Sequence, residues 1–106
     1  EERICRRLGN LDGLQRTLGN QALIVRAWGD LDRALALHKE EERICRQLNN
    51  PQGLAISLIN QSQILNMQGK RYQALQAAQQ AFELARRSGY NTLAQQIAGT
   101  IRQMGG

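Results

Sequence analysis

The chain has 106 residues, a length typical of one small domain, and its 14 Lys and Arg against 9 Asp and Glu give a net charge of +5. No apolar run approaches the roughly 18–20 residues that span a bilayer, and the scarcity of Val, Thr, Tyr and Pro disfavours a β-rich fold. Two cysteines without a CxxC motif and one histidine argue against a disulfide scaffold or a structural zinc site.

The sequence repeats itself at an offset of forty residues. The letters of 1–6, Glu-Glu-Arg-Ile-Cys-Arg, recur unchanged at 41–46, and a degenerate third copy starts near Ala81. Such a period is typical of stacked repeats, which have no single central core. We therefore expect about two and a half units in one solenoid over residues 1–106: part of a second helix over 1–10, repeats over 11–50 and 51–90, and a terminal capping helix over 91–106.

Each unit is predicted to contain two helices. Leu14, Leu18, Ala22 and Val25 form one apolar stripe at helical spacing, which we expect to face the core, and the next unit repeats it. The same patterning along the chain predicts helices near 1–8, 11–28, 31–48, 51–68, 71–88 and 91–104.

Residue types at the predicted helix ends support these boundaries. Asn10 and Asn50 are predicted N-caps, and Pro51 follows at the first helical position, where its missing N–H costs nothing. Gly29 and Gly69 are predicted to end the first helix of each pair and to allow a tight turn.

The two ends of the array are expected to differ from its middle. Glu1 enters the repeat at the position of Glu41, halfway along a helix, so we expect a piece of a longer array. The short helix over 1–8 is expected to fray or to dock onto another copy, a route to self-association through exposed repeat ends. The apolar stripe of the last helix, from Leu93 to Met104, is shifted by about one residue, as expected of a capping helix.

At Gly29 and Ala34, and again at Gly69 and Ala74, the chain resembles the tetratricopeptide repeat family over its whole length. Its forty-residue period is similar to the long repeats of kinesin light chains and of many bacterial multidomain proteins. Leu-Gly-Asn-Gln-Ala at 18–22 is similar to the Leu-Asn-Asn-Leu-Ala segment of their first helices. The resemblance implies an all-α solenoid of antiparallel helix pairs. The first, or A, helices line its concave surface and the second, or B, helices cover its convex side.

A stripe on the two A helices is the candidate binding surface. In peptide-binding members of the family, an Asn two positions before a small residue bonds the peptide backbone, which implies this role for Asn20 and Asn60. An amide offers both a donor and an acceptor, which an extended backbone requires. Arg16 and Arg26 would pair with ligand carboxylates, so an acidic partner would fit. The candidate peptide-binding residues are Arg16, Asn20, Leu23, Arg26, Ile56, Asn60, Gln63, Asn66 and Met67.

These residues also have a structural interpretation, which the sequence leaves open. Asn20 and Asn60 would equally serve by bonding a neighbouring helix and holding the stacking. For Arg16 and Arg26 a solvated face is the favoured interpretation, and Ile56 would widen the core stripe.

His38 is the only imidazole, and Glu41 and Glu42 lie three and four residues after it. That spacing places the three on one helix face and would bind a metal weakly, but we favour a packing role for His38 in the middle of its helix. The charged run 38–43 is otherwise predicted to be a solvated convex face.

The cysteines and aromatic residues are also assigned packing roles. Cys5 and Cys45 occupy equivalent positions on adjacent B helices, about 10 Å apart, whereas a disulfide needs Cα atoms within about 7 Å. They are predicted to be buried thiols in a reducing, cytoplasmic setting. Trp28 and Tyr72 are predicted to cover hydrophobic seams beside the turns between helices.

The leading hypothesis is a non-enzymatic scaffold that binds an extended peptide or partner segment in the concave groove, with no cofactor, metal or membrane partner. No catalytic motif is present in the sequence. An alternative is a structural or regulatory spacer array of a larger bacterial signalling protein, with no ligand of its own. Nucleic-acid or other polyanion binding ranks last, because no aromatic residues interleave the basic ones. Its candidate residues are Lys70, Arg71, Arg86, Arg87 and Arg102.

Overall fold

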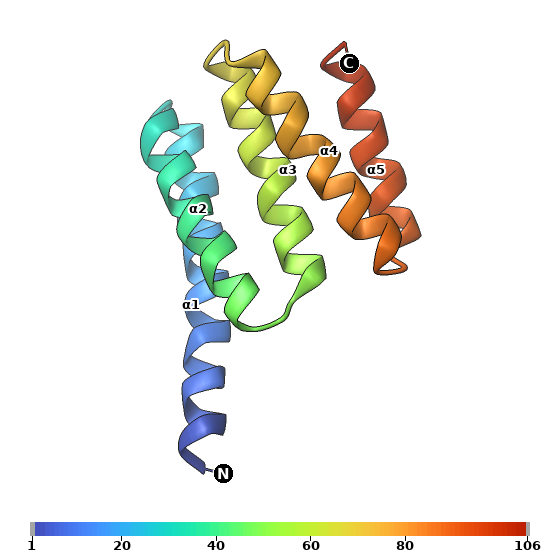
Figure 1. The fold of residues 1–106 in the computed structure, drawn as a ribbon. Coiled ribbons are helices and arrows are strands. Elements are labelled where there is room, and N and C mark those ends of the chain that lie inside the picture. The colour runs from blue at the N-terminus through green and yellow to red at the C-terminus, as the bar shows by residue number, and fades with distance from the viewer. Residues whose placement is uncertain (1, 106) are drawn as a thin grey trace.

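The computed structural model describes the backbone of residues 2–105 and the side chains of residues 9–105. Five helices follow one another along the chain, and each packs antiparallel against the next (Figure 1). The predicted all-α solenoid is confirmed. The helices are α1 (Glu2–Ala27), α2 (Leu31–Gln47), α3 (Pro51–Met67), α4 (Arg71–Arg87) and α5 (Asn91–Gln103).

From Ala27 onward, the helices end and begin at the predicted turn residues. Gly29 and Gly69 adopt positive φ angles of 87° and 82°, which glycine reaches without strain, and Gly89 does the same before α5. Between α2 and α3 the left-handed residue is Asn49, with φ 54°. The Asn50 side chain accepts a hydrogen bond of 3.0 Å from the backbone N–H of Gly53, so its predicted capping role is confirmed.

The predicted break near residues 9 and 10 is wrong. The helices expected over 1–8 and 11–28 form one continuous helix, and Asn10 lies inside it rather than capping it. The difference from the next unit lies in one residue. Pro51 lacks the N–H that would continue α2, whereas Leu11 in the equivalent position keeps it. The predicted fraying or docking of the first residues concerns side chains 1–8, which lie outside the described part.

The predicted core stripe of α1 is confirmed in three of its four positions. Leu18, Ala22 and Val25 are buried, but Leu14 is 44% exposed. Its equivalent, Leu54, is half-buried because it packs against the apolar cluster that α3 forms with α4 and α5.

The C-terminal half has a continuous apolar core between α3, α4 and α5. Small alanines of α4 and branched residues of α3 and α5 meet there, and the predicted shifted stripe of α5 contributes Ala94 and Ile97. The close approach of α4 to its neighbours follows from its alanines, which occupy little volume. The buried members are Ala55, Leu58, Ile59, Ala78, Ala81, Ala85, Ala94 and Ile97.

The aromatic side chains beside the turns do not pack as predicted. Trp28 and Tyr72 are each 74% exposed, so neither covers a hydrophobic seam within the described residues. The Tyr72 hydroxyl instead accepts a hydrogen bond of 3.0 Å from Gln76 Nε2 on the surface of α4. Both residues lie at helix ends, where no following helix passes over them.

Candidate functional site

Five of the nine predicted site residues line one hollow on the α1–α3 side of the molecule. This first hollow has a volume of about 300 Å³ and receives residues from α1, α2 and α3. It brings together Arg16, Asn20 and Leu23 of α1 with Ile56 and Asn60 of α3. The remaining lining residues, which the sequence interpretation missed, are Gln15, Gly19, Glu41 and Gly53.

The other four predicted residues line a second hollow of about 220 Å³. It joins Arg26 of α1 to Gln63, Asn66 and Met67 of α3. Helix α5 and the residue after it add three residues that the sequence does not predict here, because its pattern indicates only a capping role for this helix. They are Thr100, Gln103 and Met104. The odd-numbered helices α1, α3 and α5 therefore share the face that carries both hollows.

The Asn side chains of the first hollow have no hydrogen-bond partner within residues 9–105, whereas the arginine of each hollow already has a partner. Among the described residues, neither the Asn20 nor the Asn60 side chain makes a hydrogen bond, so no stacking contact occupies them there. Arg26 Nη1 donates to Gln63 Oε1 at 3.1 Å and so links α1 to α3. Arg16 lies on the exposed surface, 3.5 Å from Asp12, as a solvated ion pair that contributes little stability.

Glu41 reaches the first hollow from α2, and its burial contradicts the predicted solvated face for the run 38–43. It is 7% exposed, and His38, whose predicted packing role is confirmed, is fully buried. His38 Nδ1 lies 2.9 Å from Glu41 Oε1, so the tautomer with hydrogen on Nδ1 donates to the carboxylate. Lys39 and Arg43 of the same run are exposed, as predicted.

A polar network holds α2 against α3 behind the hollow. Ser57 Oγ donates to the His38 carbonyl at 2.8 Å, and Gln61 Nε2 donates to Glu42 Oε1 at 2.9 Å. Burial raises the pKa of the Glu42 carboxyl, but the hydrogen bonds from Gln61 and Arg46 outweigh it, and the net shift is downward. These bonds fix the rotation of α2 and thereby the position of Glu41.

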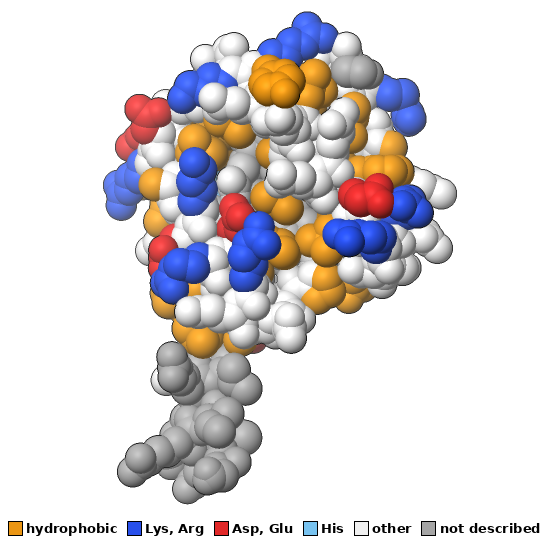
Figure 2. All heavy atoms as spheres, in the orientation of Figure 1, with side chains coloured by type: hydrophobic (Ala, Val, Ile, Leu, Met, Phe, Trp, Pro, Cys, Tyr) orange, Lys and Arg blue, Asp and Glu red, His pale blue; other side chains and the backbone are white. Residues whose placement is uncertain are grey.

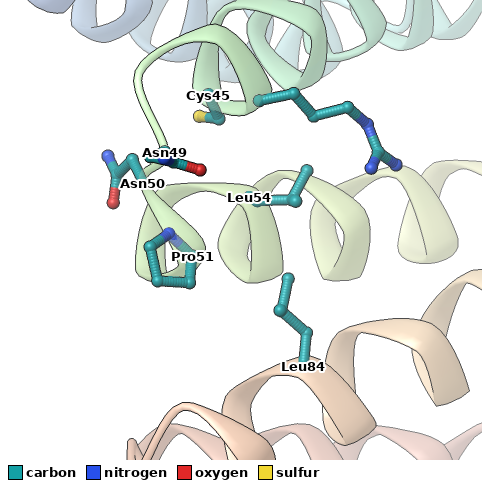
Figure 3. A pocket seen from close by; sticks show the side chains of 7 residues that line it. Cys45, Asn49, Asn50, Pro51, Leu54 and Leu84 are labelled. Carbon is teal, nitrogen blue, oxygen red and sulfur yellow. The ribbon is translucent and has the colours of Figure 1, made fainter.

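A third hollow lies between the end of α2, the start of α3 and α4, and none of the predicted site residues lines it. Figure 3 shows Leu84 of α4 pointing towards Leu54 of α3, with Cys45 of α2 nearby. Burial raises the pKa of the Cys45 thiol to about 11, so the group stays protonated at neutral pH. Cys45 is buried, as predicted.

The basic side chains of residues 9–105 do not gather into one stripe. Figure 2 shows Lys and Arg scattered over the face in view, several of them beside Asp or Glu. Arg86 and Arg87 end α4, whereas Lys70 and Arg71 lie at its other end, about 24 Å away along the helix. Arg86 pairs with Glu83, and Arg71 Nη2 donates to the Gly105 carbonyl at 2.7 Å.

The repeated antiparallel helix pairs, the glycine turns and the shared face of the odd-numbered helices agree with a comparison against known families. Residues 13–87 match the tetratricopeptide repeat family model. The chain belongs to the tetratricopeptide repeat family. No curated protein and no solved structure matches it.

Membership of the tetratricopeptide repeat family sets the broad function. Such repeats generally mediate protein–protein interactions and are typically non-catalytic, and no enzyme family is detected in this chain. Among residues 2–105, none of the helices has both the length and the apolar character needed to cross a membrane.

Proposed function

We propose that this chain binds an extended peptide or partner segment along the face shared by α1, α3 and α5. One observation carries the proposal: all nine residues selected from the sequence line two hollows on that face. Asn20 and Asn60 belong to the same hollow and have no bonding partner among the described residues. Their amides can therefore meet the alternating donors and acceptors of a peptide backbone.

The apolar and charged residues of the two hollows give the proposed ligand its side-chain contacts. Leu23 and Ile56 offer exposed apolar surface in the first hollow, and Met67 does so in the second, which the half-buried Met104 also lines. Arg16 and Arg26 lie in different hollows and would each meet a ligand carboxylate, so acidic positions flank the bound segment. The buried, protonated thiol of Cys45 suits a reducing cytoplasm, and the likeness to the long repeats of bacterial multidomain proteins suggests a larger bacterial protein.

The test uses a random library of immobilised twelve-residue peptides and the full chain. The double variant Asn20→Ala/Asn60→Ala should weaken the selected peptides by about tenfold or more, because two hydrogen bonds of about 1 kcal/mol each are lost. Gln79→Ala/Gln80→Ala is the matched control, since it removes two exposed amides from α4. Equal affinity of the double variant and the wild type would show that the peptides do not use this face.

A further inference from the structure

The inner wall of the first hollow contains a buried carboxylate whose two oxygens are in different situations. Glu41 Oε1 lies 2.9 Å from His38 Nδ1. Glu41 Oε2 lies over Gly19, so close that a Cβ built on that glycine would stand 2.6 Å from it. No hydrogen-bond donor among residues 9–105 reaches Oε2. One oxygen is thus held by a buried partner while the other is left for a ligand.

Burying a carboxylate with one unbonded oxygen costs free energy unless a hydrogen-bond donor reaches that oxygen. A carboxylate taken out of water loses hydration that one hydrogen bond does not restore. The nearest cation on the wall of the hollow, Arg16, is exposed and already lies 3.5 Å from Asp12. The side chain of Glu41 is only 9% exposed, so bulk water restores only part of the lost hydration.

The equivalent positions of the next unit show that the hollow is not a general feature of the repeat. Gly19 and Glu41 correspond to Ile59 and Ala81. The small residue thus lies on the A helix in the first unit and on the B helix in the second, and the large residue lies opposite it in each case. Ile59 and Ala81 are buried together in one apolar cluster, where the branched side chain fills the space between helices. His38, which orients the carboxylate, likewise corresponds to the buried alanine Ala78.

We propose that the first hollow takes a Lys or Arg side chain of the bound peptide, whose cationic head donates to Glu41 Oε2. The inference rests on the function proposed above and names one residue class in its ligand. The aliphatic stem of such a side chain would lie on Leu23 and Ile56, and Asn20 and Asn60 would hold the adjoining backbone. A divalent metal is not favoured, because it would require several oxygen ligands and the hollow offers one carboxylate.

The experiment compares two small probes of nearly the same shape: N-acetyl-arginine methylamide, and its citrulline analogue, in which a neutral urea replaces the guanidinium and a carbonyl oxygen replaces one nitrogen donor. Titration into the isotopically labelled full chain should shift the backbone amide signals of Gly19 and Asn20 saturably with the arginine probe. We expect the citrulline probe to bind at least tenfold more weakly, because a charge-assisted hydrogen bond is about twice as strong as a neutral one.

Variants of Glu41 and of its neighbours test whether Glu41 causes the preference for the arginine probe. Glu41→Gln keeps an acceptor for His38 and should reduce arginine binding at least tenfold, to the citrulline level. Glu40→Gln removes the same charge from an exposed pair with Arg43 on the same helix and should leave binding unchanged. Gly19→Ala supplies a second test if Glu41→Gln fails to fold, because its methyl group displaces Oε2 and should weaken arginine binding in the same way.

The outcomes separate this inference from the proposed function. Equal binding of the two probes to the wild type, or an arginine preference that persists in Glu41→Gln, overturns the assignment of the hollow. A third outcome is that the selected library peptides depend on Asn20 and Asn60 but are not enriched in Lys or Arg. That result overturns the Lys or Arg assignment and leaves the proposed peptide-binding function standing. The opposite outcome is that Glu41→Gln removes arginine binding while the library peptides bind independently of Asn20 and Asn60. That result supports the cation site at Glu41 and overturns the proposed peptide binding through the two Asn residues.

Discussion

The two B helices of this protein differ in the chemistry of the contacts that each makes around its middle. Helix α2 meets α1 and α3 near its start through an apolar cluster that includes Ala34. In its middle it meets them through a buried imidazole, two carboxylates and the side chains of Ser57 and Gln61. Helix α4 meets α3 and α5 through alanines, with Ile97 in the position equivalent to Ser57. We call these the polar interface and the apolar interface.

The comparison shows that one backbone arrangement tolerates two ways of filling the space between helices. Apolar side chains fill the apolar interface because packing has no fixed direction. The polar interface must satisfy bond directions, and it leaves the first hollow beside Gly19 and Glu41. The hollow is thus a consequence of polar contacts at an internal interface, which is where we place ligand recognition.

The largest expected effect compares the equivalent residues Ile97 and Ser57. Ile97→Ala should lower the free energy of unfolding by about 3 kcal/mol, because a side chain that is 1% exposed leaves a cavity in the apolar interface. Ser57→Ala should cost about 1 kcal/mol, the worth of its hydrogen bond to the His38 carbonyl. Urea unfolding of both variants measures the difference. A loss for Ser57→Ala as large as that for Ile97→Ala would mean that the polar interface is the more tightly coupled one.

A smaller effect is expected at Gly19 and Gly99, which occupy equivalent positions of α1 and α5. Gly99→Ala should raise the free energy of unfolding by about 0.5–1 kcal/mol, because only the end of Arg102 lies within 4 Å of the added Cβ. Gly19→Ala should lower it, because displacing Glu41 costs a charged hydrogen bond worth about 1.5–3 kcal/mol, more than the helix gains. Thermal unfolding checks both signs. A stabilised Gly19→Ala variant would show that Glu41 moves aside freely.

The smallest expected effect is the acid sensitivity of the polar interface. The pKa of Glu42 lies below its ordinary value of 4.5 in the folded protein, so its ionised form stabilises the fold above that pH. This contribution should be lost as the pH falls through the lowered pKa, and we expect it to be below about 1 kcal/mol. Glu42→Gln should therefore lose less stability than the wild type between pH 5 and about 3 in urea unfolding.

Glu83→Gln is the charge-matched control for this titration, since Glu83 pairs with Arg86 on the exposed surface of α4. It should keep the acid sensitivity of the wild type. If Glu42→Gln and the wild type lose stability in parallel, the hydrogen bonds from Gln61 and Arg46 do not stabilise the carboxylate.

Much of the fold could be predicted because helix formation depends on near neighbours in the chain. The period of forty, the apolar stripes, and the turns at Gly29 and Gly69 are all local signals, and α2 to α5 begin and end close to the predicted residues. The exception is the break predicted near Asn10. A favourable capping residue does not end a helix when Leu11, unlike Pro51, can continue it.

The candidate site could be predicted in part, for a related reason. The face on which Asn20 and Asn60 lie follows from helical spacing along α1 and α3, and the structure brings both into the first hollow. Glu41 lies at helical spacing from the buried His38 and Cys45, so periodicity could have placed it on the inner face of α2, but its charge led to the prediction of a solvated position. Its burial depends on Gly19, which lies on another helix and leaves room for the carboxylate.

The sequence by itself determined the repeat, the helix pairs, the turns and the choice of residues for the proposed binding face. Only the tertiary structure decided that α1 is continuous, that Leu14, Trp28 and Tyr72 are exposed and that Glu41 is buried. The physical reason is the range of the interactions. Hydrogen bonds within a helix join residues four apart, whereas burial depends on which side chain of a distant helix comes to lie opposite.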